Sequence, residues 1–114
     1  MNAEQAARER SQQALRRLLR IAAGSTGQSR TVADFLLAWH NAEENGGWDP
    51  VDLWSVDTAI AADILGALHV IHEFHCYPGD LGFDPEITAV WERWRSNTPR
   101  QSPKSEAEDR VGAF

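Results

Sequence analysis

The sequence predicts an all-α fold, a compact bundle of four main helices and one short helix. Apolar residues recur at intervals of three and four positions in several segments, which is the spacing of an amphipathic helix. No segment shows the sustained alternation of apolar and polar residues that marks a half-buried strand. A chain of 114 residues with 42% hydrophobic and 25% charged residues has room for one core and the composition of a soluble globular domain.

The first helix is predicted over residues 2–24, where Gly24 can end it. Its apolar stripe consists of Ala7, Ala14, Leu15, Leu18 and Ala22. Because alanine side chains bury little area, we expect the beginning of this helix to be loosely held. Leu15, Leu18 and Leu19 must be shielded from water by another part of the protein. We expect the helix to fold back on its own domain rather than pair with a second chain. Residues 24–30, GSTGQSR, have the composition of a loop.

The second helix is predicted to start at Thr31, because Asp34 stands three residues later in the arrangement of a capping box. It should stop at residues 45–47, NGG, since glycines favour the end of a helix. Its apolar positions are Val32, Phe35, Leu36 and Trp39.

The remaining helices each have a predicted aspartate cap. Asp49 can cap a short helix with Pro50 at its first position, and Asp57 can start a third helix over residues 57–75. Asp84 repeats the arrangement before Pro85 and begins the last helix. The apolar side of that helix is formed by Ile87, Val90, Trp91 and Trp94.

The net charge of −6 is divided unevenly along the chain. Residues 1–30, the basic amphipathic helix and its loop, carry six arginines against two glutamates, a charge of +4. Residues 31–95, the acidic helical core, carry twelve acids against two arginines, a charge of −10. Residues 96–114 are neutral and have the composition of a flexible tail. A basic arm on an acidic body can bind a partner with either charge, or lie against its own body.

Residues 69–78, HVIHEFHCYP, gather three histidines, a glutamate and the only cysteine of the chain. Residues three and four apart on a helix can share an ion, so a zinc site is one interpretation of this segment. Its ligands would come from His69, His72, Glu73 and Cys76. The spacing differs from the His-Glu-x-x-His motif of zinc peptidases, and histidines are also favoured at a helix C-terminus by the macrodipole.

His75 falls on the opposite, apolar side of the same helix at about 100° per residue. We therefore expect His75 to be mostly buried with Leu68 and Ile71, and His69 to lie on the solvent side. Cys76 and its neighbouring histidine are two of the groups that an activated thiol nucleophile needs. Adjacency in sequence, however, does not place the histidine ring where it can act as the base. We predict no catalytic residue and no cofactor, with a zinc protein or a thiol or metal enzyme as the alternative.

The five tryptophans fall into two groups. One group continues the apolar stripes of helices, so we expect it in the core rather than stacked on nucleic-acid bases. It comprises Trp39, Trp91 and Trp94. The other group flanks the short helix among acidic residues and could form an exposed patch for a protein partner. That candidate patch comprises Trp48, Asp49, Asp52 and Trp54.

The middle of the chain resembles a family of short uncharacterised proteins from proteobacterial genomes, often encoded on integrative and conjugative elements or plasmids. The resemblance runs from Leu15 to Arg95. Its most specific pieces are TGQSRTVADFLLAWHNAEENGG and DLWSVDTAIAADI, and it continues through YPGDLGF to ERWR. The resemblance implies an accessory protein of a mobile element and supplies no catalytic residues.

Together these patterns predict a non-catalytic protein-interaction module that acts through its acidic helical body. No apolar run approaches the ~18 residues of a membrane-spanning helix, and the chain does not open with a secretory signal, so we expect a cytoplasmic monomer without membrane contact. An acidic DNA mimic and a nucleic-acid-associated regulator are the remaining alternatives. The latter would use the basic arm, Arg16, Arg17 and Arg20.

Overall fold

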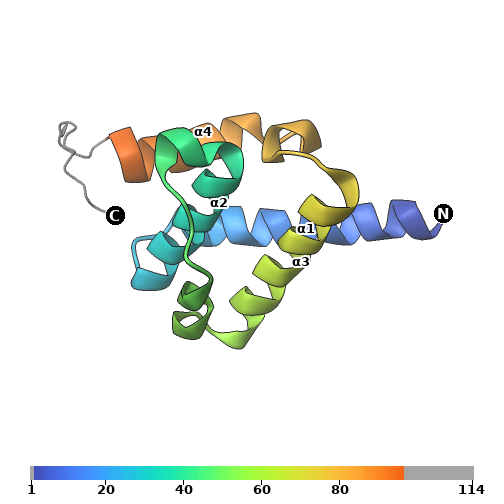
Figure 1. Ribbon diagram of the computed structural model, residues 1–114, viewed down its shortest axis with the longest axis horizontal. Helices are drawn as coiled ribbons and strands as arrows, with labels where there is room; N and C mark the ends of the chain where they lie inside the picture. The colour runs from blue at the N-terminus through green and yellow to red at the C-terminus, as the bar shows by residue number, and fades with distance from the viewer. Residues whose placement is uncertain (1, 97–114) are drawn as a thin grey trace.

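Four α-helices form most of the computed structural model, which describes residues 2–96 (Figure 1). They are α1 (Ala3–Ala22), α2 (Gly27–Asn45), α3 (Thr58–Phe74) and α4 (Asp84–Trp91). The 3-10 helices η1 (Pro50–Ser55) and η2 (Pro78–Leu81) precede and follow α3, and a π-helical turn, η3 (Glu92–Ser96), continues α4. No strand occurs within residues 2–96, and the predicted all-α bundle is confirmed. Of the tail predicted over residues 96–114, Ser96 belongs to η3 and the rest lies outside the described residues.

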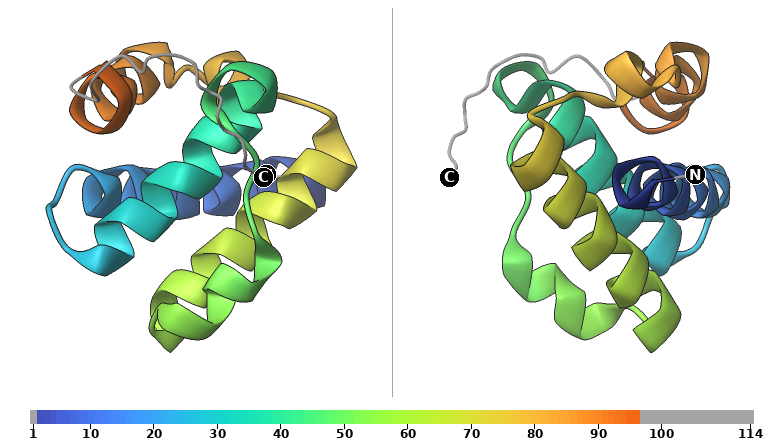
Figure 2. Two further views of the ribbon diagram at one scale, coloured as in Figure 1. Left: turned by 60° about the vertical axis from the view of Figure 1, so that its left-hand side comes forward. Right: turned by 90° about the vertical axis from the view of Figure 1, so that its right-hand side faces the viewer.

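The helix α1 is the element on which the bundle is assembled. It contacts α2, α3 and α4, and α2 contacts α4 as well. In Figures 1 and 2, α4 lies above α1 and the first turns of α3 lie below it. The N-terminal turns of α1 extend past the other helices (Figure 1) and are mostly exposed up to Arg10. The loose attachment predicted for this end stays a prediction.

The core is shared by all four helices. Each contributes a large aliphatic side chain that is at most 1% exposed: Leu18, Leu36, Ile64 and Ile87. Complete burial of a side chain of this size stabilises the fold by about 1.5–3 kcal/mol relative to its exposure. Leu15 and Leu19 of α1 are also buried within their own chain, so the predicted folding back of the first helix is confirmed.

The start of α2 differs from the prediction, because the helix begins at Gly27 and not at Thr31. The cap is Thr26, whose hydroxyl accepts a hydrogen bond of 3.0 Å from the backbone N–H of Ser29. Thr31 lies inside the helix and donates its hydroxyl to the carbonyl of Gly27. Thr26 comes before Thr31 in the chain and offers an equivalent cap, so the helix can start earlier than predicted. Only residues 23–26 then remain to turn the chain between α1 and α2.

Two of the three aspartate caps are confirmed. Asp49 accepts from the N–H of Val51, and Asp57 accepts from that of Ile60. Asp84 is not a cap, because α4 begins one residue earlier than the motif predicts, after Phe83. The carboxylate of Asp84 lies instead against Gly79, so close that a Cβ atom on residue 79 would collide with it.

Candidate functional site

The histidine and cysteine segment lies at the end of α3, where the helix stops one residue earlier than predicted. His75 has a left-handed backbone conformation, with φ of 51°, and its N–H bonds to the carbonyl of Ile71. The prediction that His75 is buried is wrong, since its side chain is exposed. The left-handed turn ends the helical phase before this residue, so its side chain no longer follows the apolar arc. His69 is exposed, as predicted.

The buried face of α3 is also rotated from the predicted one. Ala67 and Val70 are both 2% exposed, whereas Leu68 and Ile71, which were expected on the buried side, are only partly buried and Leu65 is 55% exposed. A helix presents one face to its neighbours, and small side chains let those neighbours approach closely. Hydrophobicity alone therefore did not decide which of the apolar residues of α3 face the core.

The four predicted zinc ligands do not form a metal site. His69, His72 and Glu73 are exposed, and Cys76 lies beyond the end of the helix. Within residues 2–96, no three histidine, cysteine, aspartate or glutamate side chains are placed to share a metal ion. The early stop of α3 takes Cys76 out of the helical spacing that would have placed it beside His72 and Glu73.

Cys76 has the environment of an unreactive thiol. Burial raises its pKa above the ordinary value, the negative charge of Asp80 acts in the same direction, and Arg8 acts in the opposite one. The thiolate is the nucleophilic form of cysteine, so a raised pKa lowers the reactive fraction at neutral pH. The carbonyl of Cys76 has a structural task, because it accepts a hydrogen bond of 2.8 Å from the indole of Trp39.

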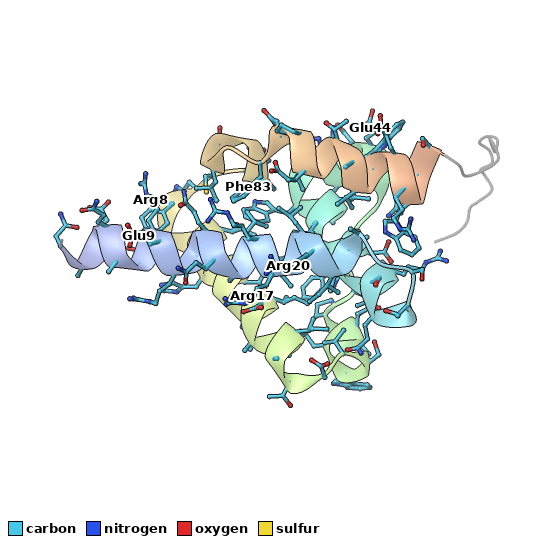
Figure 3. All side chains as sticks on the ribbon, turned by 180° about the vertical axis from the view of Figure 1, so that it is seen from behind. Arg8, Glu9, Arg17, Arg20, Glu44 and Phe83 are labelled. Carbon is cyan, nitrogen blue, oxygen red and sulfur yellow. The ribbon has the colours of Figure 1, made fainter. Side chains whose placement is uncertain are left out.

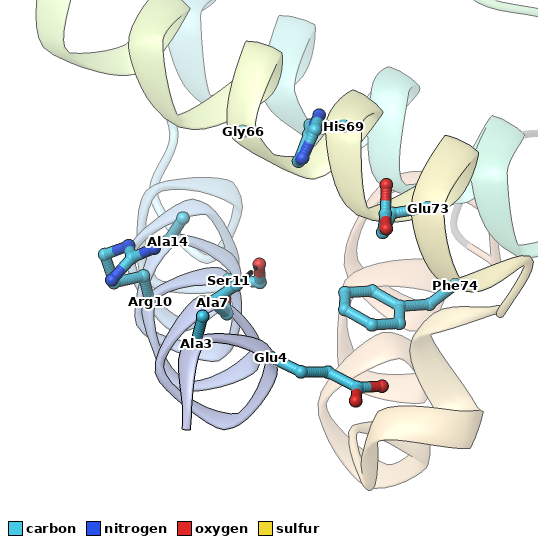
Figure 4. A pocket seen from close by; sticks show the side chains of 10 residues that line it. All are labelled: Ala3, Glu4, Ala7, Arg10, Ser11, Ala14, Gly66, His69, Glu73 and Phe74. Carbon is cyan, nitrogen blue, oxygen red and sulfur yellow. Dashed lines mark hydrogen bonds between the residues drawn. The ribbon is translucent and has the colours of Figure 1, made fainter. Parts of the chain in front are cut away.

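His69 and Glu73 face a groove of about 750 Å³ between α1 and α3 (Figure 4). The groove exists because its walls carry small residues, Ala3, Ala7, Ala14 and Gly66. Its one hydroxyl, on Ser11, donates to the carbonyl of Ala7 at 2.8 Å. No base bonds to this hydroxyl among the described residues, so the groove has no activated nucleophile.

The tryptophans divide differently from the prediction. Trp39 and Trp94 pack against the core as expected, and the indole of Trp94 donates to the carbonyl of Ala22 at 2.7 Å. Trp91 does not, because 36% of its surface is exposed where α4 gives way to the π-helical turn. Trp48 also belongs to the core, since its ring meets the edge of Phe35 with centroids 5.0 Å apart.

Trp54 is the exposed tryptophan of the predicted partner patch. It is 84% exposed on η1, and Val51 on the same short helix is 47% exposed. Asp49 caps η1, and the pKa of Asp52 is raised by burial, then by the negative charges of Asp49 and Asp34. We call these four residues, Asp49, Val51, Asp52 and Trp54, the Trp54 surface.

The basic arm is partly neutralised by the body of its own chain. Arg17 forms two hydrogen bonds of 2.9 Å with the carboxylate of Asp63 on α3. The guanidinium of Arg16 lies 5.5 Å from the ring centroid of Phe83, on the other side of α1. Figure 3 shows Arg17 on the α3 side of α1 and Phe83 on the α4 side. The three predicted arginines therefore do not form one continuous face for nucleic acid.

A second groove, of about 530 Å³, lies between α1 and α4. Arg16 and Arg20 line it from α1, and Arg93 lines it from η3. The contribution of Arg93 was not predicted from the sequence. Its signal was available, because Arg93 and Arg95 are the two basic residues of an otherwise acidic segment.

Comparison with known proteins gives one family. The model of a family described as "Family of unknown function (DUF7673)" matches residues 12–95. The chain belongs to this family. The matched segment holds the whole lining of the groove between α1 and α4 and the Trp54 surface, whereas half of the residues that line the groove between α1 and α3 precede it. It nearly coincides with the resemblance noted from Leu15 to Arg95. No match is found among curated proteins or among solved structures. Within the described part of this family member, no helix is long and apolar enough to span a bilayer.

Proposed function

We propose that the protein is a non-catalytic protein-interaction module that binds a basic protein partner through the Trp54 surface. The observation that supports the proposal is the 84% exposure of Trp54. A tryptophan in water gains free energy when a partner covers it, and tryptophan is enriched among the residues that dominate binding at protein interfaces. Asp49 and Asp52 beside it favour a partner with positive charges.

The Trp54 surface has the rigidity that an interface anchor needs. Pro50 occupies the first turn of η1, and Asp49 fixes that turn by accepting from Val51 at 3.0 Å. A side chain presented on a fixed backbone loses less conformational entropy when it binds. This pre-organisation favours a binding role for Trp54 over incidental exposure.

The biological setting of the proposal is an accessory role in a mobile element, acting in the cytoplasm. It rests on the resemblance carried by residues 26–47 and 52–64. The genes that flank the coding sequence check it: conjugation or integration genes nearby support the setting, and their consistent absence across relatives contradicts it.

The binding proposal is tested by affinity capture with the full chain, using Trp54→Ala beside a matched control, Leu65→Ala. Leu65 is also an exposed apolar residue, but it lies on α3 outside the Trp54 surface. We expect a partner that is retained at about 0.1 M salt and weakened at about 1 M, because salt screens exposed charges. Trp54→Ala should abolish retention and Leu65→Ala should leave it unchanged. Equal retention of the partner by the two variants would contradict the proposal.

A further inference from the structure

The groove between α1 and α4 combines an apolar floor with positively charged walls. Its exposed floor residues are Ala23 and Ala89, and these small side chains leave the space open. Deeper in the groove lie the edges of Leu19, Phe83 and Val90, which are otherwise buried in the core. An apolar side chain placed between the two alanines would therefore meet the core directly.

The walls are cationic and two of the three arginines are held in place. Arg16 lies over the ring of Phe83, and Arg93 lies over the ring of Trp94 at 5.6 Å. The Nε of Arg93 also donates to the carbonyl of Gly24 at 2.6 Å, which leaves its terminal nitrogens available. Arg20 makes no ion pair with any residue from 2 to 96. Stacked guanidinium groups are pre-organised donors for carboxylates.

The charge of the groove is opposite to that of the molecule. Glu86 is the one acidic residue in its lining, against three arginines, whereas the whole chain carries a net charge of −6. Arg16, Arg20 and Arg93 form no ion pair with any residue from 2 to 96, so their charges are available to an external anion. The site therefore selects for negative charge together with an apolar group.

We propose that this groove binds an acidic peptide segment of a partner protein. Carboxylates of the segment pair with Arg16, Arg20 and Arg93, and one large apolar side chain of the segment enters between Ala23 and Ala89. A short peptide fits better than a nucleic acid, because phosphates make no contact with an apolar floor and because a nucleic acid carries a charge at every nucleotide beyond the groove, which the net charge of −6 repels. This site is independent of the Trp54 surface: η1 and α4 lie at opposite ends of the molecule in Figures 1 and 2.

The test begins with a random peptide library displayed on phage and selected against the full chain at about 0.1 M salt, where surface charges are only partly screened. We expect the enriched peptides to carry several acidic residues around a leucine, phenylalanine or tryptophan. A synthetic, fluorescently labelled form of one enriched peptide then serves as the probe. In NMR spectra of the full chain, its addition should shift the amides of Leu19, Ala23 and Ala89.

Two pairs of variants separate this groove from general charge effects. Arg20→Glu should weaken binding of the probe about tenfold, because it replaces an attraction by a repulsion, while Arg10→Glu makes the same charge change on α1 outside the groove and should alter it less than twofold. Ala89→Glu should also weaken binding about tenfold, and Thr88→Glu, one residue away on α4 and outside the groove lining, should not.

Four outcomes would overturn the proposal. Enriched peptides without acidic residues would remove the role of the arginines. Equal losses in each variant and its control would place the probe elsewhere. Displacement of the probe by a single-stranded oligonucleotide at comparable concentration would favour nucleic acid as the occupant. Displacement by a synthetic peptide of residues 101–114 of this chain would identify the chain's own segment as the occupant.

Discussion

At the residue scale, two core tryptophans differ in what their indole N–H groups contact. Trp39 and Trp48 both pack against the core and against Phe35. The N–H of Trp39 donates to the carbonyl of Cys76, whereas the N–H of Trp48 is buried and has no hydrogen-bond partner among the described residues. A buried donor without a partner costs about 1–3 kcal/mol of desolvation free energy. Trp48 thus stabilises the core through its shape and its apolar area, not through its N–H group.

This difference predicts that the same substitution, tryptophan to phenylalanine, changes the free energy of unfolding differently at the two positions. Trp39→Phe removes a hydrogen bond and leaves a carbonyl unsatisfied, while Trp48→Phe removes an unsatisfied donor. We expect Trp39→Phe to lower the free energy of unfolding by about 1 kcal/mol more than Trp48→Phe. Urea denaturation of the two variants measures it, with equal m values as the check on two-state behaviour. A larger loss for Trp48→Phe would show that its N–H has a partner in solution.

The thiol of Cys76 carries a second prediction at this scale, on pH dependence. Burial raises its pKa, so the folded protein holds the protonated, unreactive form to higher pH than an unfolded chain does. The rate of alkylation by iodoacetamide should be low at neutral pH. It should still be rising above about pH 8.5, where an ordinary thiol is half ionised. The same chain in denaturant is the control, and equal pH profiles for the two would contradict the assignment.

At the scale of elements, caps and backbone breaks determine where the helices begin and end. Thr26 starts α2, and Asn41 interrupts it, with φ of −166° and ψ of 88°. The amide oxygen of Asn41 accepts from the N–H of Glu44, so it starts the last turn of α2 as a cap would. Short polar side chains compete in this way for backbone donors, and this competition can end one helix and begin another within a single segment.

Two threonines of α2 give a matched test of the cap. Thr26→Ala removes the acceptor for the N–H of Ser29 and should lower the free energy of unfolding by about 1 kcal/mol. Thr31→Ala changes a residue inside the helix, where alanine is the better helix former, and should change stability by less than about 0.5 kcal/mol. Thermal or urea denaturation compares them. A larger loss of unfolding free energy for Thr31→Ala than for Thr26→Ala would instead support a helix start at Thr31.

At the scale of the whole molecule, α1 is inseparable from the body that follows it. Leu15 and Leu18 lie in one core with residues from all other helices, and Arg17 joins Asp63 across the boundary between the basic and acidic segments. The uneven charge of the chain is thus partly balanced within the fold. What remains unbalanced is local, with cations at the α1 and α4 groove and acids at the Trp54 surface.

The core position of α1 predicts a monomer whose stability depends on Leu18. Leu18→Ala should lower the free energy of unfolding by about 2–5 kcal/mol, because it opens a cavity where the side chain was 0% exposed. The melting temperature of the unmutated protein should be independent of concentration, since no second chain is needed to cover the leucines. Differential scanning calorimetry at several concentrations checks it, and a melting point that rises with concentration would instead indicate a dimer.

The sequence by itself determined the fold class, the helices and two of the four predicted caps, because apolar periodicity and capping residues act over a few neighbouring positions. Asp49, Asp57 and the leucine stripe of α1 were predicted from such local patterns. Trp54 could be named as a candidate for exposure only because it lies outside a helical stripe. These features depend on the chemistry of a segment and not on its surroundings.

Tertiary structure alone decided which apolar residues of α3 are buried and which arginines meet. Leu65 is exposed although the smaller Ala67 is buried, since the positions of the neighbouring helices choose among the apolar residues of α3. His75 left the predicted arc because the backbone turned at the helix end. Arg20 and Arg93 are far apart in sequence but line one groove. For the buried residues of α3 and for the groove arginines the physical reason is the same: the packing of whole helices fixes contacts between distant residues, and no local pattern encodes it.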